Sequence, residues 1–368
     1  MKRIGLIVNP IAGMGGRVGL KGTNGADVVA KALELGAKPV SPARAMETLQ
    51  ILKQSGAEFE LITYPAEMGA TEARGVGLES RVIGQITPGL TTAEDTKRAA
   101  KEMVELGVDL ILVAGGDGTM CDLIEAIGTR VPILGVPTGV KMHSATFANT
   151  PQTAGEVAAH FLSEGLPLRE AEVMDIDEEA YRDNRLVAKL KGYARVPYEP
   201  VMMQATKEGS TGYELADQKA IARWVVELME REHVYALGPG TTTRTVAEEL
   251  GIYDSTLLGV DLIEDYKLLA RDTNEQQILK VIGKKPMTII VSPIGKQGFI
   301  LGRGNQQLSP EVLKKIGKEN IWVIATPHKL ELTPTLKVDT GDAGLDDEFR
   351  DYIPVITGYR QKRVIRVS

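Results

Sequence analysis

Short apolar runs alternate with helix-like stretches along the first half of the chain. The apolar runs are bounded by turn residues and read as strands over residues 4–8, 58–63, 81–86, 109–113 and 132–136. Between them lie predicted helices over residues 27–35, 43–54, 93–106 and 120–127. This alternation predicts an α/β domain with a doubly wound parallel sheet, in which ligands bind at the carboxyl ends of the strands.

The second half has a different pattern and is richer in strands. Long strands are predicted over 168–176 and 186–196, joined by an acidic connection, with shorter ones over 288–291 and 321–325 and helices over 212–230 and 241–250. The apolar, β-rich end over 352–367 is expected to dock onto the body. We therefore predict a domain over 1–150, a second, β-rich α/β domain over 151–350 and a docking segment over 351–368.

Length, charge and cysteine content narrow the class of protein. At 368 residues the chain fits two domains, and its 43% apolar and 25% charged residues are typical of a soluble globular protein. A net charge of −6 argues against general nucleic-acid binding, and no run of about 18 apolar residues is present to span a membrane. The single cysteine, Cys121, excludes an internal disulfide and suits a reducing cytoplasm. The four histidines show no metal-ligand spacing.

One predicted strand runs directly into a glycine-rich turn and then into a helix. The turn consists of Gly115, Gly116, Asp117, Gly118 and Thr119. Glycines let backbone N–H groups approach a phosphate closely, and the N-terminus of the helix favours negative charge. An acid at the centre of such a turn can organise Mg²⁺ or accept a proton from an attacking hydroxyl. The alternative is a tight turn in which Asp117 only caps the helix.

The first predicted strand leads into a loop with six glycines. This loop contains the candidate phosphate-binding residues Asn9, Gly13, Gly15, Gly16, Arg17 and Lys21. It can wrap nucleotide phosphates while the two cations neutralise them. It matches neither a P-loop nor a G-x-G-x-x-G fingerprint, which disfavours a dehydrogenase of the Rossmann type. Taken alone, the loop is better interpreted as a flexible surface connection, and only together with the turn over 115–119 does it favour a phosphate site.

Three further turns follow predicted strands and carry polar side chains. Lys141, His143 and Ser144 follow the strand over 132–136 and can reach the same crevice, or can be ordinary solvated or interior residues. Thr241, Thr242, Thr243 and Arg244 begin a helix, and they provide more hydroxyl groups than a helix cap needs. Lys296, Arg303, Asn305 and Gln307 form a donor-rich surface or a solvated turn.

These segments together resemble the superfamily of NAD kinases and diacylglycerol kinases. The chain is most similar to the ATP-NAD kinase-like branch, which includes the acetoin-catabolism X proteins. The similarity spans nearly the whole chain and is most specific over 115–119, with support from Asn9-Pro10 and from 135–144, 238–244 and 302–307. The resemblance implies that Asp117 takes part in phosphoryl transfer, that the domain over 1–150 binds nucleotide and that the domain over 151–350 binds the acceptor.

The departures from the family pattern fall on the acceptor side. NAD kinases have an Asn-Glu pair that holds the dinucleotide, whereas Asn274-Glu275 lies too late in this chain, at a predicted helix start. The segment over 238–244 resembles the family's Pro-Thr-Gly-Ser-Thr-Ala-Tyr segment only loosely. Phosphoryl transfer is therefore better supported than NAD as the acceptor.

The leading hypothesis is a Mg²⁺-dependent kinase that transfers a phosphoryl group from ATP, or another donor, to the 2′-hydroxyl of NAD. Asp117 is the expected catalytic residue, and Lys141, His143, Ser144, Thr241–Thr243, Arg244, Arg303 and Asn305 are expected to bind the acceptor. The alternatives are a kinase for a sugar, polyol or lipid alcohol, and a nucleotide-binding sensor without catalysis. The expected partners are small nucleotides, with no nucleic acid and no membrane, and the expected assembly is a cytoplasmic homo-oligomer.

Overall fold

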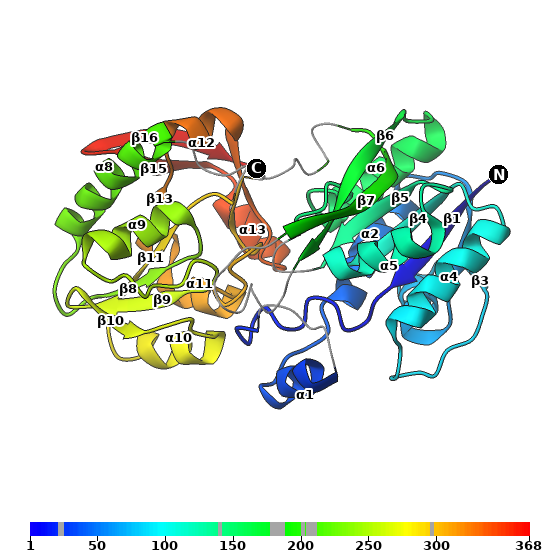
Figure 1. The fold of residues 1–368 in the computed structure, drawn as a ribbon, viewed down its shortest axis with the longest axis horizontal. Coiled ribbons are helices and arrows are strands. Elements are labelled where there is room, and N and C mark those ends of the chain that lie inside the picture. Colours follow the sequence, from blue (N-terminus) through cyan, green and yellow to red (C-terminus); the bar gives the residue numbers. More distant parts are fainter. Residues whose placement is uncertain (21–25, 139–141, 177–187, 200–202, 204–211, 295–297) are drawn as a thin grey trace. The chain divides into compact units, whose positions relative to one another are not determined.

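The computed structural model describes residues 1–20, 26–138, 142–176, 188–199, 203, 212–294 and 298–368. The chain divides into two compact units (Figure 1). The N-terminal unit comprises Met1–Met14, Gly22–Ala180 and Leu186–Thr206, and the C-terminal unit comprises Gly15–Lys21, Tyr181–Arg185 and Lys207–Ser368. Each unit has its own sheet and its own hydrophobic core.

The N-terminal unit is built on a parallel sheet with the strand order β3-β2-β1-β4-β5. Its strands are β1 (Lys2–Val8), β2 (Phe59–Thr63), β3 (Arg81–Val82), β4 (Leu110–Gly115) and β5 (Ile133–Pro137). The sequence-based prediction of a doubly wound parallel sheet is confirmed. The largest difference is in the run predicted over 81–86, because β3 pairs through two residues at the edge of the sheet.

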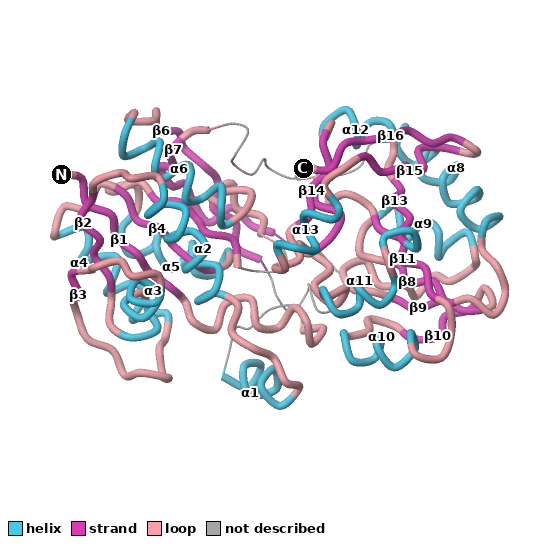
Figure 2. The backbone as a smooth tube through the Cα atoms, turned by 180° about the vertical axis from the view of Figure 1, so that it is seen from behind, coloured by secondary structure: helices cyan, strands magenta, loops and turns pink. Residues whose placement is uncertain are grey.

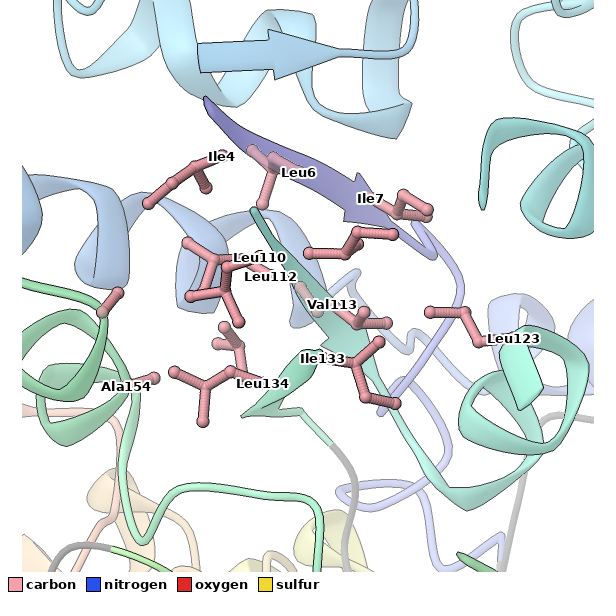
Figure 3. Close-up of a cluster of buried hydrophobic side chains, with 14 of the residues drawn as sticks. Ile4, Leu6, Ile7, Leu110, Leu112, Val113, Leu123, Ile133, Leu134 and Ala154 are labelled. Atoms are coloured by element: carbon pink, nitrogen blue, oxygen red, sulfur yellow. The ribbon is translucent and has the colours of Figure 1, made fainter. Parts of the chain in front are cut away.

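Helices cover both faces of this sheet, as the two opposite views show (Figures 1 and 2). The helices of the unit are α1 (Ala26–Glu34), α2 (Ser41–Gln54), α3 (Ala70–Gly75), α4 (Ala93–Glu105), α5 (Asp117–Ile127) and α6 (Pro151–Ser163). Helices α2 and α6 pack together on one face, and α4 and α5 on the other. Apolar side chains from the central strands β1, β4 and β5 fill the core between the layers (Figure 3).

The N-terminal unit continues past residue 150, where we predict a domain boundary. Helix α6 begins at Pro151 with Thr150 as its N-cap, and the Thr48 hydroxyl of α2 donates to the Pro151 carbonyl at 2.8 Å. A Cβ at Gly155 would lie 2.7 Å from the Thr48 carbonyl, so the two helices pack at close range. Strands β6 (Leu168–Ile176) and β7 (Ala188–Pro197) then form an antiparallel pair that packs on α5 and β5.

Described residues of the C-terminal unit form a nine-stranded mixed sheet with the order β10-β9-β8-β11-β13-β15-β16-β14-β12. The central strands β8 (Val234–Leu237), β11 (Met287–Val291), β13 (Ile321–Ile324) and β15 (Tyr352–Gly358) are parallel. The others are β9 (Asp261–Glu264), β10 (Lys267–Ala270), β12 (Phe299–Leu301), β14 (Thr335–Val338) and β16 (Gln361–Val367). The apolar end of the chain therefore supplies two strands of this sheet.

The central strands of this sheet are buried on both faces, and successive side chains enter different cores. In β8, Val234 and Ala236 belong to one core, whereas Tyr235 and Leu237 belong to the other. Helices α8 (Gly212–Leu228) and α9 (Thr241–Glu249) cover the second face. The first core includes side chains from α10 (Glu275–Ile282), α11 (Pro310–Ile316), α12 (Pro327–Leu332) and α13 (Ala343–Phe349). Among the described residues, no helix is both long enough and apolar enough to cross a membrane.

Candidate functional site

Asp117 lies where the central strand β4 passes into helix α5. Strand β4 ends at Gly115, Gly116 is the N-cap of α5 in extended conformation, and Asp117 is the first residue of the helix. The first N–H groups of a helix have no partner within it, and they carry the positive end of its dipole. The turn therefore presents backbone donors at the carboxyl edge of the parallel sheet, as an anion site requires.

The Asp117 carboxylate binds two backbone amides from the segment after β5. The His143 N–H donates to Oδ2 at 2.7 Å, and the Ser144 N–H donates to Oδ1 at 2.8 Å. Asp117 is only 8% exposed. Its carboxylate connects the start of α5 to the segment that follows β5. Its two N–H donors fix the orientation of the carboxylate plane.

Asn9 connects the end of β1 to the same turn. Its Nδ2 donates to Thr119 Oγ1 at 3.0 Å, and its backbone N–H donates to the Ala114 carbonyl at 2.9 Å. Gly13 lies against the segment after β5, because a Cβ built on it would be 2.0 Å from the Thr138 carbonyl oxygen. The structure thus brings Asn9, Gly13 and Asp117 to one edge, where β1, β4 and β5 end.

His143 and Ser144 reach Asp117 through their backbones. The Ser144 hydroxyl accepts from the Met174 N–H of β6 at 3.0 Å, so this side chain ties the segment to the antiparallel pair. His143 is buried. Lys141, also a predicted acceptor-binding residue, lies outside the described residues, as do Lys21 and Lys296.

The glycine-rich loop after β1 is divided between the two units. Asn9 and Gly13 belong to the N-terminal unit, whereas Gly15, Gly16 and Arg17 belong to the C-terminal unit. There the Arg17 carbonyl accepts from the Glu275 N–H at the start of α10 at 3.2 Å, and the Gly15 carbonyl accepts from the Leu20 N–H. Asn274 is the N-cap of α10, which confirms that Asn274-Glu275 lies at a helix start.

The metal chemistry of the N-terminal site is limited by its ligands. Within the described part of the chain, no group of three or more His, Cys, Asp or Glu side chains converges to hold a metal ion. Mg²⁺ keeps several waters and needs only one or two protein carboxylates when substrate phosphates supply the other oxygens. Asp117 as the carboxylate of this turn therefore fits an ion that arrives with a nucleotide better than it fits a resident metal.

A second polar cluster lies at the carboxyl ends of β8, β11 and β13 in the C-terminal unit. The Lys329 ammonium donates to Ser292 Oγ at 3.2 Å and to Thr242 Oγ1 at 3.4 Å. Ser292 directly follows β11 and Thr242 lies in the first turn of α9, while Lys329 lies in α12 after β13. Because both hydroxyls accept from the ammonium, their own protons are available to donate to a ligand.

Two buried side chains from α8 complete this cluster. Glu214 accepts from the Thr326 hydroxyl at 3.2 Å, and Gln218 Nε2 donates to Thr241 Oγ1 at 3.2 Å. Burial lowers the pKa of the Lys329 ammonium, and the Glu214 carboxylate opposes that shift. A partly desolvated ammonium beside two hydroxyls can bind an anionic oxygen strongly, because few water molecules compete.

Sequence reasoning identified Thr241 and Thr242 of this cluster and missed Thr326 and the charged side chains. Glu214, Gln218, Ser292, Thr326 and Lys329 were not predicted as site residues. One signal in the sequence could have identified two of these residues. Ser292 and Thr326 directly follow predicted strands, and ligands of α/β proteins bind at the carboxyl ends of strands.

The remaining predicted acceptor residues have local partners. Thr243 donates to the Gly240 carbonyl at 3.0 Å, and Arg244 forms an i,i+4 pair with Glu248 on the helix surface. Asn305 Nδ2 donates to the Ile300 carbonyl at 2.9 Å, and Arg303 is buried over the Phe299 ring. Hydrogen bonds therefore join Thr241 and Thr242 to the Lys329 cluster, whereas Thr243 and Arg244 have partners within α9.

Cys121 lies one turn beyond Asp117 in α5 and gives a test of the packing at this site. Its Sγ is 3.6 Å from the Met174 carbonyl, and burial raises the thiol pKa to about 12, with the Asp175 and Asp117 charges adding to the shift. Because the thiolate is the reactive species, native protein at pH 8 should react with a thiol reagent about 100-fold or more slowly than unfolded protein. Stopped-flow thiol titration with and without guanidinium measures this ratio, and equal rates would contradict the buried position.

Two α/β units, one with an acid-bearing glycine-rich turn between a strand and a helix, define a class of protein suited to phosphate chemistry. A family model described as the ATP-NAD kinase N-terminal domain matches residues 4–166. A second, described as the ATP-NAD kinase C-terminal domain, matches residues 230–367. The chain belongs to the ATP-NAD kinase family, which supports a kinase-like function. A search among curated proteins found no match.

Proposed function

We propose that this protein transfers the γ-phosphoryl group of ATP, or of another phosphate donor, to the 2′-hydroxyl of NAD and so forms NADP. The observation that carries the proposal is the fixed Asp117 carboxylate beside the N-terminus of α5, in a chain of the ATP-NAD kinase family. Phosphoryl transfer needs positioned donors for the phosphate oxygens and an acceptor for the hydroxyl proton, and this turn offers both.

In this proposal the residues of the turn have separate roles. The N–H groups at the start of α5 bind phosphate oxygens, and glycine at 116 leaves open space, since a Cβ there would meet no atom within 4 Å. Asp117 orients the attacking hydroxyl and accepts its proton, or holds the Mg²⁺ that arrives with ATP. When bound, Mg²⁺ neutralises the charge that develops on the transferred phosphoryl group.

The polar cluster of the C-terminal unit supports binding of a phosphate-bearing substrate. Lys329 supplies a positive charge, and Thr242 and Ser292 supply hydroxyl donors. We assign them to substrate phosphate or ribose oxygens, because an ammonium with two hydroxyls at the start of α9 matches an oxyanion in charge and in donors.

A second candidate, a kinase for another hydroxyl compound, rests on Asn274. The only Asn-Glu pair in the chain is Asn274-Glu275, and the Asn274 carboxamide accepts from the Gln277 N–H at 3.0 Å as a helix cap. Because the Asn274 side chain caps α10, the identity of the acceptor is less well supported than phosphoryl transfer itself. A sugar or polyol acceptor would use the same Asp117 turn.

The direct test is incubation of the full-length protein with Mg-ATP and NAD, followed by chromatographic quantification of NADP. We expect NADP to accumulate with one ADP formed per NADP. Parallel reactions with NADH, sugars and polyols define the acceptor. Turnover of ATP with one of these and none with NAD would replace the NAD proposal with the second candidate. Absence of turnover with every acceptor would contradict both.

A further inference from the structure

The first turns of helix α8 place polar side chains on a buried face. Glu214 is 7% exposed and Gln218 is 3% exposed, and the same face continues with the fully buried residues Ile221, Ala222 and Val225. The spacing i, i+4, i+7, i+8 and i+11 describes one continuous stripe along the helix. Apolar residues would fill the first two positions at lower cost, because a buried polar group must find hydrogen-bond partners. The polar end of the stripe therefore indicates a function beyond packing.

Glu214 is linked to Lys329 through Thr326. The Thr326 hydroxyl donates to Glu214 Oε1 at 3.2 Å, and its oxygen accepts from the Lys329 backbone N–H at 3.3 Å as the N-cap of α12. The carboxylate thus fixes the direction of the hydroxyl proton and leaves a lone pair of that oxygen for the Lys329 N–H. This bond holds the start of α12, and with it the backbone from which the Lys329 side chain reaches Ser292 and Thr242.

Glu214 also supplies the charge that opposes the desolvation of Lys329. Burial lowers the pKa of the Lys329 ammonium, and the Glu214 carboxylate raises it. The groups that the ammonium contacts from α9 and from the end of β11 are uncharged hydroxyls. On α12 itself, His328 and Glu331 pair with each other at the surface. Among the described residues, no carboxylate forms an ion pair with this ammonium, so an anionic ligand can take the place of a direct partner.

We propose that Glu214 is a positioning residue for substrate binding, which fixes the start of α12 through Thr326 and supplies the counter-charge for Lys329 without pairing with it directly. The ammonium is thereby held in place and can bind a phosphate oxygen of the substrate. A carboxylate in direct contact would instead compete with that phosphate. The role of Glu214 rests on the proposed function in one respect, the assignment of Lys329 to a substrate phosphate.

Trace acetylation of the full-length protein with acetic anhydride tests this role without any need for turnover. Because only the neutral amine reacts, the yield of acetylated Lys329 against pH, measured by mass spectrometry, gives the titration of this residue. Inorganic phosphate is the probe for the anion site. We expect phosphate to protect Lys329 from acetylation in the parent protein near neutral pH, since the bound anion covers the amine and favours its charged form.

Glu214→Gln and Glu227→Gln are the matched variants. The first keeps the shape of the side chain and removes its charge, and the second removes the same charge from an exposed position on the same helix. With Glu214→Gln, Lys329 should lose its proton at lower pH, because the carboxylate that raises its pKa is gone. In the pH range where Lys329 is neutral in this variant and charged in the parent, phosphate should bind about tenfold or more weakly. Glu227→Gln should match the parent in both measurements.

A cycle with Lys329→Met distinguishes positioning from a general effect on folding. In the parent background, Glu214→Gln should raise the KM for NAD at alkaline pH by about tenfold and change kcat by less than about twofold. In the Lys329→Met background, the same substitution should raise KM no further, because Glu214 acts through that lysine. If circular dichroism shows that Glu214→Gln has lost its fold, Glu214→Met provides the same comparison.

Three outcomes would overturn the proposal. They are an unchanged titration of Lys329 in Glu214→Gln, a failure of phosphate to protect Lys329 in the parent protein, and additive effects of the two substitutions on KM. Formation of NADP without protection of Lys329 would refute the role of Glu214 while the kinase proposal stands. Protection of Lys329 without turnover of any acceptor would refute the kinase proposal and leave the anion site and the role of Glu214 in place.

Discussion

Asp117→Asn should lower the rate of phosphoryl transfer by about 10²–10⁴-fold, the range expected when a general base is removed. The affinity for nucleotide should change little, because the N–H groups of α5 remain. The structure adds an effect on stability. Asparagine presents an NH₂ group in place of one carboxylate oxygen, so either the His143 or the Ser144 N–H would face a second donor. That mismatch should cost about 1–3 kcal/mol of unfolding free energy.

Asp122→Asn provides the matched control for this substitution. Asp122 lies on the same helix, is partly buried, and burial raises the pKa of its carboxyl. A raised pKa means that ionised Asp122 destabilises the folded state at neutral pH, so the neutral amide should leave stability unchanged or increase it. Its turnover should equal that of the parent. Steady-state kinetics and thermal unfolding of both variants separate chemistry from folding, and equal turnover in the Asp117 and Asp122 variants would contradict the role of Asp117.

Gly13→Ala should be the most damaging single-methyl change at the edge where β1 and β5 end. Gly13 has φ +81°, and an added Cβ would lie 2.0 Å from the Thr138 carbonyl oxygen. The left-handed conformation costs alanine about 1 kcal/mol, and the clash with backbone adds about 1–3 kcal/mol because neither main chain can move aside cheaply. The melting temperature of the N-terminal unit should therefore fall by about 5–12 °C.

Gly36→Ala separates the cost of the steric clash at Gly13 from the cost of placing alanine in the left-handed conformation. Gly36 also has φ +81°, but a Cβ there would meet no atom within 4 Å. This variant should lose only about 1 kcal/mol, the conformational part alone. Differential scanning calorimetry of the two variants gives the comparison. Equal losses would mean that Gly13 does not lie against Thr138.

The local pattern of apolar and turn residues was sufficient to predict much of the fold. The buried runs of β1, β4 and β5 and the helix starts at α9 and α10 were predicted, since strand runs and turn residues act over a few positions. Helix α5 begins at Asp117, three residues before the predicted start at residue 120. Helix α6 was not predicted, because its small residues, such as Ala154 and Gly155, serve close packing on α2 and give no clear apolar stripe. Strand β8 is a run of four residues, too short to be distinguished from a helical segment by period.

The contacts of the candidate sites depend on strand order, which local pattern does not encode. Asp117 meets the amides of His143 and Ser144 because β4 and β5 are neighbours in the sheet. Thr242 and Lys329 lie 87 positions apart in the sequence and meet because β8, β11 and β13 are adjacent. The sequence indicated which turns are polar, whereas the pairing of their side chains required the sheet topology.

Phosphoryl transfer by this protein should depend on the Asp117 carboxylate. The most direct measurement is the transfer of label from [γ-³²P]ATP to NAD, with the parent protein, Asp117→Asn and Asp122→Asn compared at equal folded concentration. We expect labelled NADP with the parent and with Asp122→Asn, and a rate lower by at least about 10²-fold with Asp117→Asn. Labelled product at the parental rate from Asp117→Asn, or label released only as inorganic phosphate by the parent protein, would contradict these expectations.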